Sequence, residues 1–295
     1  MNIYRLTYCI TPRQDIVLPS ITSRLVKQIF VKSLRENGLE KIAELFMSKT
    51  ELSRTPVKPV RVTFIYRRQS DSTEFLWCEY ERRPVIRKGV NYYFDIVVFE
   101  TDSYAYRGIV INADTVLKIL DSISGEYEVF NMGTVEVKLQ EVNVVSERDL
   151  EPDDDYDTVL IEFKTPTLLQ YPKHPRLRDY PSRHTLYPQP MLTVLSLVYK
   201  WNNLVKRNYV SLSHVLFAPY EIIEVNHCIK PVTIQFRKLR ERGFVGWVKY
   251  GIDSRSEKRR LTYLKLFNFS KFSGIGRSSN IGLGEVCIKF DKRKK

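Results

Sequence analysis

The sequence predicts an α+β protein of two tandem ferredoxin-like domains, each with the element order β-α-β-β-α-β. Three observations support this class. The same order of strand-like and helix-like periodicity occurs twice, an acidic segment with few apolar residues separates the two occurrences, and a glycine-rich segment precedes the last strand. With 295 residues and 43% hydrophobic content, the chain is long enough to bury a core in each of two domains.

The first domain is expected to span residues 1–146. Alternating apolar and polar residues, or short apolar and aromatic runs, predict its strands at 4–10, 60–66, 75–80, 92–99 and 135–145. Apolar residues at helical spacing predict helices over 20–35 and 112–122. Residues 147–157 follow as a predicted acidic linker, because they contain Pro152 and almost no apolar side chain.

The second domain is expected to span residues 158–295 and to repeat the order of the first. Its predicted strands cover 158–164, 220–229, 232–237, 243–250 and 285–290. A helix is predicted from Pro190 to Lys206, since proline suits the first helical turn. A second helix is predicted to begin at Ser254, because Ser254 and Glu257 have the spacing of a capping box.

The positive charge of the chain is concentrated in its second half. Residues 1–150 contain 21 Lys and Arg against 20 Asp and Glu, whereas residues 151–295 contain 26 against 14. The balances are +1 and +12, so the second half attracts polyanions, of which nucleic acid is the commonest in a cytoplasm. The alternative is a basic surface that only keeps the protein soluble.

Other composition features exclude several classes. The apolar stretches are too short to span a bilayer and the N-terminus lacks a signal-peptide pattern, so a cytoplasmic protein without membrane contact is expected. The four cysteines are widely scattered, without the spacing typical of metal sites: Cys9, Cys78, Cys228 and Cys287. No metal site and no cofactor is therefore predicted.

The segment Gly274–Gly284, GIGRSSNIGLG, holds four of the twelve glycines. Such density lets backbone N–H groups turn outward toward an anion, and Arg277 adds a positive charge, which predicts contact with a phosphate backbone. Neither nucleotide motif fits, since Gly-Lys-Ser/Thr is absent and the expected helix precedes the loop. The alternative is a tight connection packed against the core.

Four segments resemble the CRISPR-associated endoribonucleases that cut repeat RNA, within the superfamily called repeat-associated mysterious proteins. They are Phe163–Leu169, Tyr199–Asn202, Gly243–Tyr250 and Gly274–Val286, and Leu18-Pro19-Ser20 resembles the opening of the first helix. The resemblance implies two ferredoxin-like folds, metal-independent cleavage and RNA lying against the glycine-rich loop. It also implies attack of the 2′-hydroxyl on the neighbouring phosphate, leaving a 2′,3′-cyclic phosphate and a 5′-hydroxyl.

Many members of this family place a histidine after the first helix, but all four histidines of this chain, beginning with His174, lie in its second half. The resemblance therefore points to lysines from comparable places, Lys27 and Lys58, as catalytic candidates. Arg24 lies three residues from Lys27 on one helix face, and Arg242 precedes the strand at 243–250, so both could contact the same phosphate. For each residue the alternative is a solvated surface charge.

The expected RNA contacts come from the glycine-rich loop and from basic residues of the second half. They are Gly274, Gly276, Arg277, Ser278, Ser279, Gly282, Gly284, Arg240, Arg255, Lys258, Arg259 and His184. The expected partner is CRISPR repeat RNA, with a homodimer and hand-over of guide RNA to an effector complex implied by the resemblance. The alternative function is a non-catalytic RNA-binding subunit of a CRISPR ribonucleoprotein complex.

Overall fold

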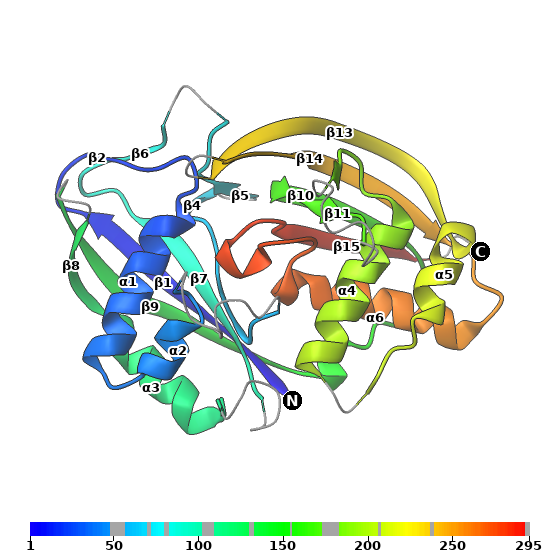
Figure 1. Cartoon of the computed structure of the whole chain (residues 1–295), viewed down its shortest axis with the longest axis horizontal. Helices are drawn as coiled ribbons and strands as arrows, with labels where there is room; N and C mark the ends of the chain where they lie inside the picture. The colour runs from blue at the N-terminus through cyan, green and yellow to red at the C-terminus, as the bar shows by residue number, and fades with distance from the viewer. Residues whose placement is uncertain are drawn as a thin grey trace. The chain divides into compact units, whose positions relative to one another are not determined.

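The computed structural model describes residues 1–47, 57–69, 72–79, 83–101, 109–129, 133–153, 155–172, 183–205, 208–236 and 239–292. The chain forms two compact units. The first contains Met1–Glu147 together with Asn280–Gly282, and the second contains Arg148–Ser279 together with Leu283–Lys295. In each unit, helices cover one face of an antiparallel sheet (Figure 1).

The sheet of the first unit has the strand order β5-β4-β7-β1-β9-β8, and β3 also pairs with β7. Its strands are β1 (Asn2–Pro12), β3 (Val60–Val62), β4 (Tyr66–Gln69), β5 (Ser72–Phe75), β7 (Tyr92–Phe99), β8 (Gly125–Val129) and β9 (Gly133–Ser146). Two short strands, β2 (Ile16–Val17) and β6 (Val85–Ile86), pair separately. The central order β9-β1-β7-β3 is that of a ferredoxin-like fold, in which the first and third strands lie in the middle.

The described residues of the first unit form the helices α1 (Ser23–Glu36), α2 (Glu40–Glu44) and α3 (Ala113–Ile123). The helix-facing side chains of β1 include Tyr8, whose hydroxyl donates to the Leu120 carbonyl of α3. Asn112 caps α3, because its side chain accepts a hydrogen bond from the amide of Thr115 at 2.9 Å. The alternation along β1 therefore places its apolar side chains between sheet and helices, as predicted.

The first helix begins at Ser23 rather than at Ser20, and the strand predicted over 60–66 is interrupted. Both differences involve Thr22, whose hydroxyl donates to the Leu76 carbonyl and accepts from the Ile65 amide. The Ile65 amide thus bonds a side chain of another segment, and the Asp95 amide of β7 bonds the Thr63 hydroxyl, so the regular pairing of β3 ends at Val62. The apolar run predicted at 75–80 forms a strand only up to Phe75, and Tyr80 lies outside the described residues.

The sheet of the second unit has the order β13-β14-β10-β15, again ferredoxin-like. Its strands are β10 (Tyr156–Thr167), β13 (Ile222–Phe236), β14 (Leu239–Ile252) and β15 (Val286–Lys292), and the pair β11 (Leu169–Gln170) and β12 (His184–Thr185) lies apart from it. The helices are α4 (Pro190–Leu204), α5 (Ser213–Glu221) and α6 (Glu257–Ser273), with the 3-10 turns η2 (Arg148–Leu150) and η4 (Ser279–Ile281). The predicted tandem ferredoxin-like architecture is confirmed.

Several boundaries in the second unit differ from prediction. The strands predicted at 220–229 and 232–237 are one edge strand, β13, which tolerates Pro231 because an edge strand has one unpaired side. Helix α6 begins at Glu257, since Ser256 caps it by accepting from the Arg259 amide, while Ser254 bonds the backbone of Ser256. Lys206 and Arg237 lie outside the described residues.

The predicted acidic linker is largely part of the second unit. The η2 turn buries Leu150, whose carbonyl accepts from the Asn268 side chain of α6 at 3.1 Å. Strand β10 then begins at Tyr156, two residues before its predicted start. Within the described part of the chain, no helix is long and apolar enough to cross a membrane.

Candidate functional site

The first unit places Lys27 and Lys58 close enough for their charges to interact, and their catalytic role stays a prediction. Lys27 is half-buried on α1, and Lys58 is half-buried just before β3. Burial lowers the pKa of Lys58 to about 8, and the positive charge of Lys27 contributes to the shift in the same direction. Arg24, one turn before Lys27, is exposed. These three residues form the basic cluster of the first unit.

The segment after α2 holds Lys58 in place. The Lys58 ammonium donates to the carbonyl of Leu45, and it lies 5.6 Å from the ring centroid of Phe46. Phe46 packs edge-to-face against Phe30 of α1, with ring centroids 5.4 Å apart. Leu45 and Phe46 were not predicted, because nothing in the spacing of α2 indicates that its end meets the residue before β3.

A lysine with a pKa near 8 exchanges its proton close to neutral pH. In its charged form it can stabilise an anionic phosphate or donate a proton to a leaving oxygen. The neighbouring ammonium of Lys27 adds a second positive charge. The basic cluster therefore has the chemistry for acid and electrostatic catalysis on a phosphodiester.

The glycine-rich segment has a buried stem and an exposed tip. Gly274, Gly276, Gly282 and Gly284 are buried and have positive φ angles of 64°, 84°, 84° and 64°. A Cβ atom at Gly284 would collide with the Ile275 carbonyl, one at Gly276 would lie 2.6 Å from the Leu168 carbonyl oxygen, and one at Gly282 would lie 2.8 Å from the Phe64 amide nitrogen. These positions need glycine for both conformation and close packing.

The stem amides donate within the protein, which corrects the expectation that they turn outward to an anion. Gly274 donates to Ser270, Gly276 to the Ser196 hydroxyl, and Gly284 to the Pro166 carbonyl, at 2.8, 2.8 and 3.0 Å. The amides of the intervening Ile275 and Arg277 also bond carbonyl oxygens. The alternative of a tight packed connection therefore describes the stem.

The tip, Arg277 to Ser279, includes the exposed side chain of the loop. The Arg277 side chain is exposed, and Ser278 and Ser279 are half-buried. Ser278 has a φ of 60°, a conformation that costs a non-glycine residue free energy and that is found preferentially at ligand sites. RNA contact by the loop stays a prediction, and Arg277, Ser278 and Ser279 are the tip side chains accessible for it.

His184 lies close to the tip. Its Nε2 atom is 3.9 Å from Oε2 of Glu241, and only 10% of its side chain is exposed. Burial lowers the pKa of His184. The charge of Glu241 opposes this shift and the charge of Arg277 adds to it, so the net shift is downward. A largely covered, neutral imidazole suits positioning better than phosphate binding. The RNA contact predicted for His184 remains untested, and His174 lies outside the described residues.

Arg240, predicted to contact RNA, and Arg242, a catalytic candidate, lie near the start of β14. Arg240 is opposite Gln235 and Arg242 is opposite Thr233, and both side chains are exposed. Because they are two residues apart on a strand, they point to the same side of the sheet. They can therefore contact one phosphate or two adjacent phosphates.

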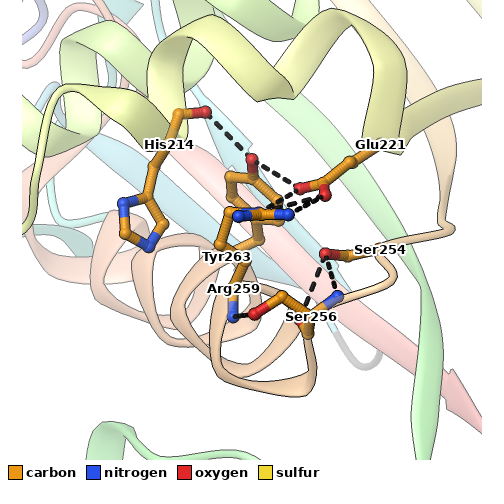
Figure 2. Close-up of polar contacts among 6 residues, drawn as sticks. All are labelled: His214, Glu221, Ser254, Ser256, Arg259 and Tyr263. Atoms are coloured by element: carbon orange, nitrogen blue, oxygen red, sulfur yellow. Dashed lines mark hydrogen bonds and ion pairs between the residues drawn. The ribbon is translucent and has the colours of Figure 1, made fainter.

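The basic residues at the start of α6 have different environments. Arg255 and Lys258 are exposed, whereas Arg259 forms a bidentate ion pair with Glu221, with Nη2 to Oε1 at 2.7 Å and Nε to Oε2 at 2.9 Å (Figure 2). The Arg259 guanidinium also lies 4.1 Å from the ring centroid of Phe217. The geometry thus gives Arg259 a structural contact, while Arg255 and Lys258 face solvent.

Glu221 is the centre of this network and was not predicted. Its carboxylate is buried and also accepts from the Tyr263 hydroxyl, which donates to the His214 carbonyl as well (Figure 2). Burial raises the pKa of Glu221, but the hydrogen bonds from Arg259, Ser254 and Tyr263 outweigh this and leave it below its ordinary value. Glu221 therefore stays ionised and fixes α5 to α6.

Comparison with known proteins identifies the family. A family model described as "Cas6 N-terminal domain" matches residues 4–145, and one described as "CRISPR-associated endoribonuclease Cas6" matches residues 161–286. Two curated relatives from Saccharolobus solfataricus, CRISPR-associated endoribonuclease Cas6 2 and Cas6 1, are 26% and 24% identical to this chain. The alignments cover 98% and 99% of this chain and 97% and 98% of the relatives.

Solved structures show the same fold. A Cas6 product complex has a TM-score of 0.68 at 14% identity, covering 97% of this chain and 100% of that chain. Thermus thermophilus Cas6 has a TM-score of 0.62 at 14% identity, covering 97% and 98% of the two chains. With the two domain models spanning nearly its whole length, the chain belongs to the Cas6 family of CRISPR-associated endoribonucleases.

Proposed function

We propose that this chain cleaves CRISPR repeat transcripts into guide units in the cytoplasm, without a metal ion, by attack of the 2′-hydroxyl on the neighbouring phosphate. The observation that carries the proposal is the pairing of Lys27 with a half-buried Lys58 whose pKa is lowered to about 8. In this reaction the nucleophile belongs to the RNA. The protein has to align the phosphate, offset its developing negative charge and supply a proton to the departing 5′-oxygen.

The basic cluster supplies these functions in our proposal. Lys58 is the proton donor, because burial lowers its pKa to about 8, close to neutral pH. Lys27 and Arg24 stabilise the charge on the phosphate. Arg242, the other catalytic candidate, is assigned to phosphate binding by the second unit. This assignment replaces the histidine that many family members use, since residues 1–173 contain no histidine.

RNA binding is assigned mainly to the second unit. Arg277, Ser278 and Ser279 contact the backbone from the loop tip, and the buried glycines hold the loop in shape. Exposed cations of the same unit bind further phosphates: Arg240, Arg255 and Lys258. The charge balance of +12 over residues 151–295 supports this placement.

The reaction can be tested with an RNA that contains one CRISPR repeat of the source genome. Incubation in EDTA should cut this RNA once per repeat, and the products should carry 2′,3′-cyclic phosphate and 5′-hydroxyl ends. Intact RNA under single-turnover conditions, despite binding, would overturn the proposal in favour of a non-catalytic RNA-binding subunit. Cleavage that EDTA abolishes would overturn the metal-independent mechanism.

The catalytic lysines can be tested by substitution. Lys27→Ala and Lys58→Ala should each slow single-turnover cleavage by about 100-fold, the effect typical of removing an acid or charge stabiliser, with at most about a threefold change in affinity. Lys32→Ala is the matched control, because Lys32 lies on the same helix but is exposed and pairs with Glu36. Equal losses of binding and cleavage would show that Lys27 and Lys58 bind the phosphate without a separate catalytic role.

A homodimer is also proposed, supported by an apolar stripe on α5. Leu212, Leu216 and Tyr220 are four residues apart and are 56%, 70% and 81% exposed. The acidic residue of α5, Glu221, is buried against Arg259, so this stripe presents no like charges to a second copy. Light scattering should show a dimer that Leu216→Glu dissociates, whereas Leu117→Glu on α3, 58% exposed, should not. A monomeric wild-type chain would contradict this proposal.

The resemblance further implies that the guide RNA passes to a CRISPR effector complex. Labelled product incubated with that complex should leave this protein and appear in the complex. Product that stays bound to this protein would contradict the hand-over.

A further inference from the structure

The glycine-rich loop leaves α6 at the negative end of the helix dipole. Helix α6 ends at Ser273, with Gly274 as its C-cap, and its last carbonyls carry partial negative charge. A phosphate bound by the following residues would be repelled by these carbonyls. An anion-binding loop at this end of a helix therefore requires a compensating cation.

Lys200 of α4 provides that cation from within the core. Its side chain is buried, with 7% of the residue exposed. The ammonium donates to the carbonyl of Ser273 at 3.1 Å and to that of Gly274 at 2.8 Å. The lysine therefore caps the end of α6 and places a positive charge directly behind the start of the loop.

Ser196 lies one turn before Lys200 on the same face of α4 and binds the next part of the stem. Its hydroxyl oxygen accepts from the Gly276 amide at 2.8 Å. Lys200 and Ser196 thus hold Gly274 and Gly276 on either side of Ile275, immediately before Arg277. The conformation of the exposed tip depends on this attachment, because both glycines have positive φ angles that free chain segments leave readily.

We propose that Lys200, together with Ser196, is a positioning residue for RNA binding, which fixes the stem of the loop and offsets the negative end of α6. This inference rests on the proposed RNA-processing function. Lys200 acts through the loop and does not contact RNA itself. Its removal should weaken RNA binding and raise KM, with little effect on the cleavage rate at saturating RNA, because the basic cluster is unchanged.

The test compares Lys200→Met with Lys265→Met. Lys265 is a suitable control because it lies on α6, is also largely covered at 19% exposure, and forms an ion pair with Glu151 and a contact with the Trp201 ring instead of the loop. Both substitutions keep an apolar side chain of similar length and remove one positive charge. Lys200→Met should lower thermal stability more, because it leaves two carbonyls without their buried donor, whereas Lys265 pairs with the exposed Glu151. RNA binding is therefore compared at a temperature at which both variants are fully folded, so that a difference reports on the loop.

Two measurements separate positioning from general destabilisation. Hydrogen exchange of the peptide covering 274–284 should accelerate in Lys200→Met and stay unchanged in Lys265→Met. The Kd for a repeat RNA with a 2′-deoxy substitution at the cleavage position, mapped with the wild-type chain, should rise about tenfold in Lys200→Met only, as expected for removal of a charge-assisted contact. KM should rise by the same factor while kcat changes less than about threefold.

Ser196→Ala keeps the proposal testable if Lys200→Met does not fold. It removes one acceptor from the stem and should weaken RNA binding about threefold with faster exchange at Gly276. Equal Kd and exchange in the Lys200 and Lys265 variants, with wild-type protein that binds and cuts the repeat RNA, would overturn this inference alone. Wild-type protein that neither binds nor cuts the RNA would overturn the proposed function as well.

Discussion

Lys58 shows how its surroundings change the chemistry of one residue. It precedes a buried strand, donates to a helix-end carbonyl and faces a second lysine, and its pKa falls from an ordinary 10.5 to about 8, chiefly because burial disfavours its charged form. The direction in which stability changes with pH follows from this shift in pKa. Between about pH 8 and pH 10.5 the unfolded chain binds more protons at this site than the native chain, so the stability contribution of Lys58 improves as pH rises through that window.

Catalysis should have the opposite dependence on pH. If the protonated form of Lys58 donates to the leaving oxygen, its active fraction declines as pH rises through about 8. Lys58→Arg keeps the charge at all accessible pH values and serves as the reference. The ratio of wild-type to Lys58→Arg single-turnover rates should fall about tenfold between roughly pH 7 and pH 9, measured on the same repeat RNA. A constant ratio would show that deprotonation of Lys58 does not limit cleavage.

At the scale of the element, the glycine-rich segment is a packed connection with a short functional tip. Its stem glycines bond the chain on both sides and leave no room for a side chain. The glycines therefore let backbone segments approach each other closely. The side chains available to a ligand in solution are those of Arg277, Ser278 and Ser279. The loop is consequently more rigid than its composition suggests.

Gly284→Ala should be much more destabilising than an ordinary glycine substitution. An added Cβ would collide with the Ile275 carbonyl and the alanine would also have to adopt φ of 64°, so a decrease of about 3 kcal/mol or more in unfolding free energy is expected. Gly89→Ala is the control, because Gly89 has φ of 70° with no atom within 4 Å of the added Cβ, and should cost about 1 kcal/mol. Denaturant unfolding of both variants measures the difference, and equal decreases would show that the stem relaxes around a side chain.

Sequence patterns predicted elements whose apolar residues are buried and missed one whose apolar residues are exposed. The strand Tyr92–Phe99 and the helix beginning at Pro190 were predicted with their observed starts, because apolar residues run through the strand and recur regularly on one face of the helix. Helix α5 was missed because residues such as Leu216 and Tyr220 are exposed, so its apolar pattern does not mark a buried face. The break after Val62 was missed because it depends on Thr22, which lies 43 residues before Ile65 in the chain.

The candidate site was predictable to a similar extent. Lys27, Lys58 and the glycine-rich segment were recognised from motifs and charge. Their partners were not, since Leu45 binds Lys58 and Ser196 binds Gly276 through contacts between segments distant in sequence. Such long-range partners leave no periodic signal. Charge alone also could not distinguish Arg259, which pairs with Glu221, from its exposed neighbour Lys258.

At the scale of the whole molecule, most of the net positive charge lies in residues 151–295. RNA affinity should therefore depend steeply on the salt concentration. Removing one cation that binds a phosphate should reduce the slope of log K against log salt by about 0.7 for single-stranded RNA. Arg277→Gln and Lys258→Gln should each show this reduction in binding titrations over a KCl series. Arg259→Gln should lower the melting temperature and leave the slope unchanged, because its guanidinium is held by Glu221. A reduced slope in Arg259→Gln would show that Arg259 binds an RNA phosphate.

The order in which the chain leaves the ribosome gives Asn280–Gly282 a further role. This tripeptide belongs to the first compact unit, where the Ser23 hydroxyl donates to the Ile281 carbonyl at 2.5 Å and Gly282 packs against Phe64. All other residues of that unit precede Arg148 in the chain. The N-terminal half is therefore synthesised long before the residues that complete it, so its final packing around the start of α1 has to await the synthesis of residues 280–282.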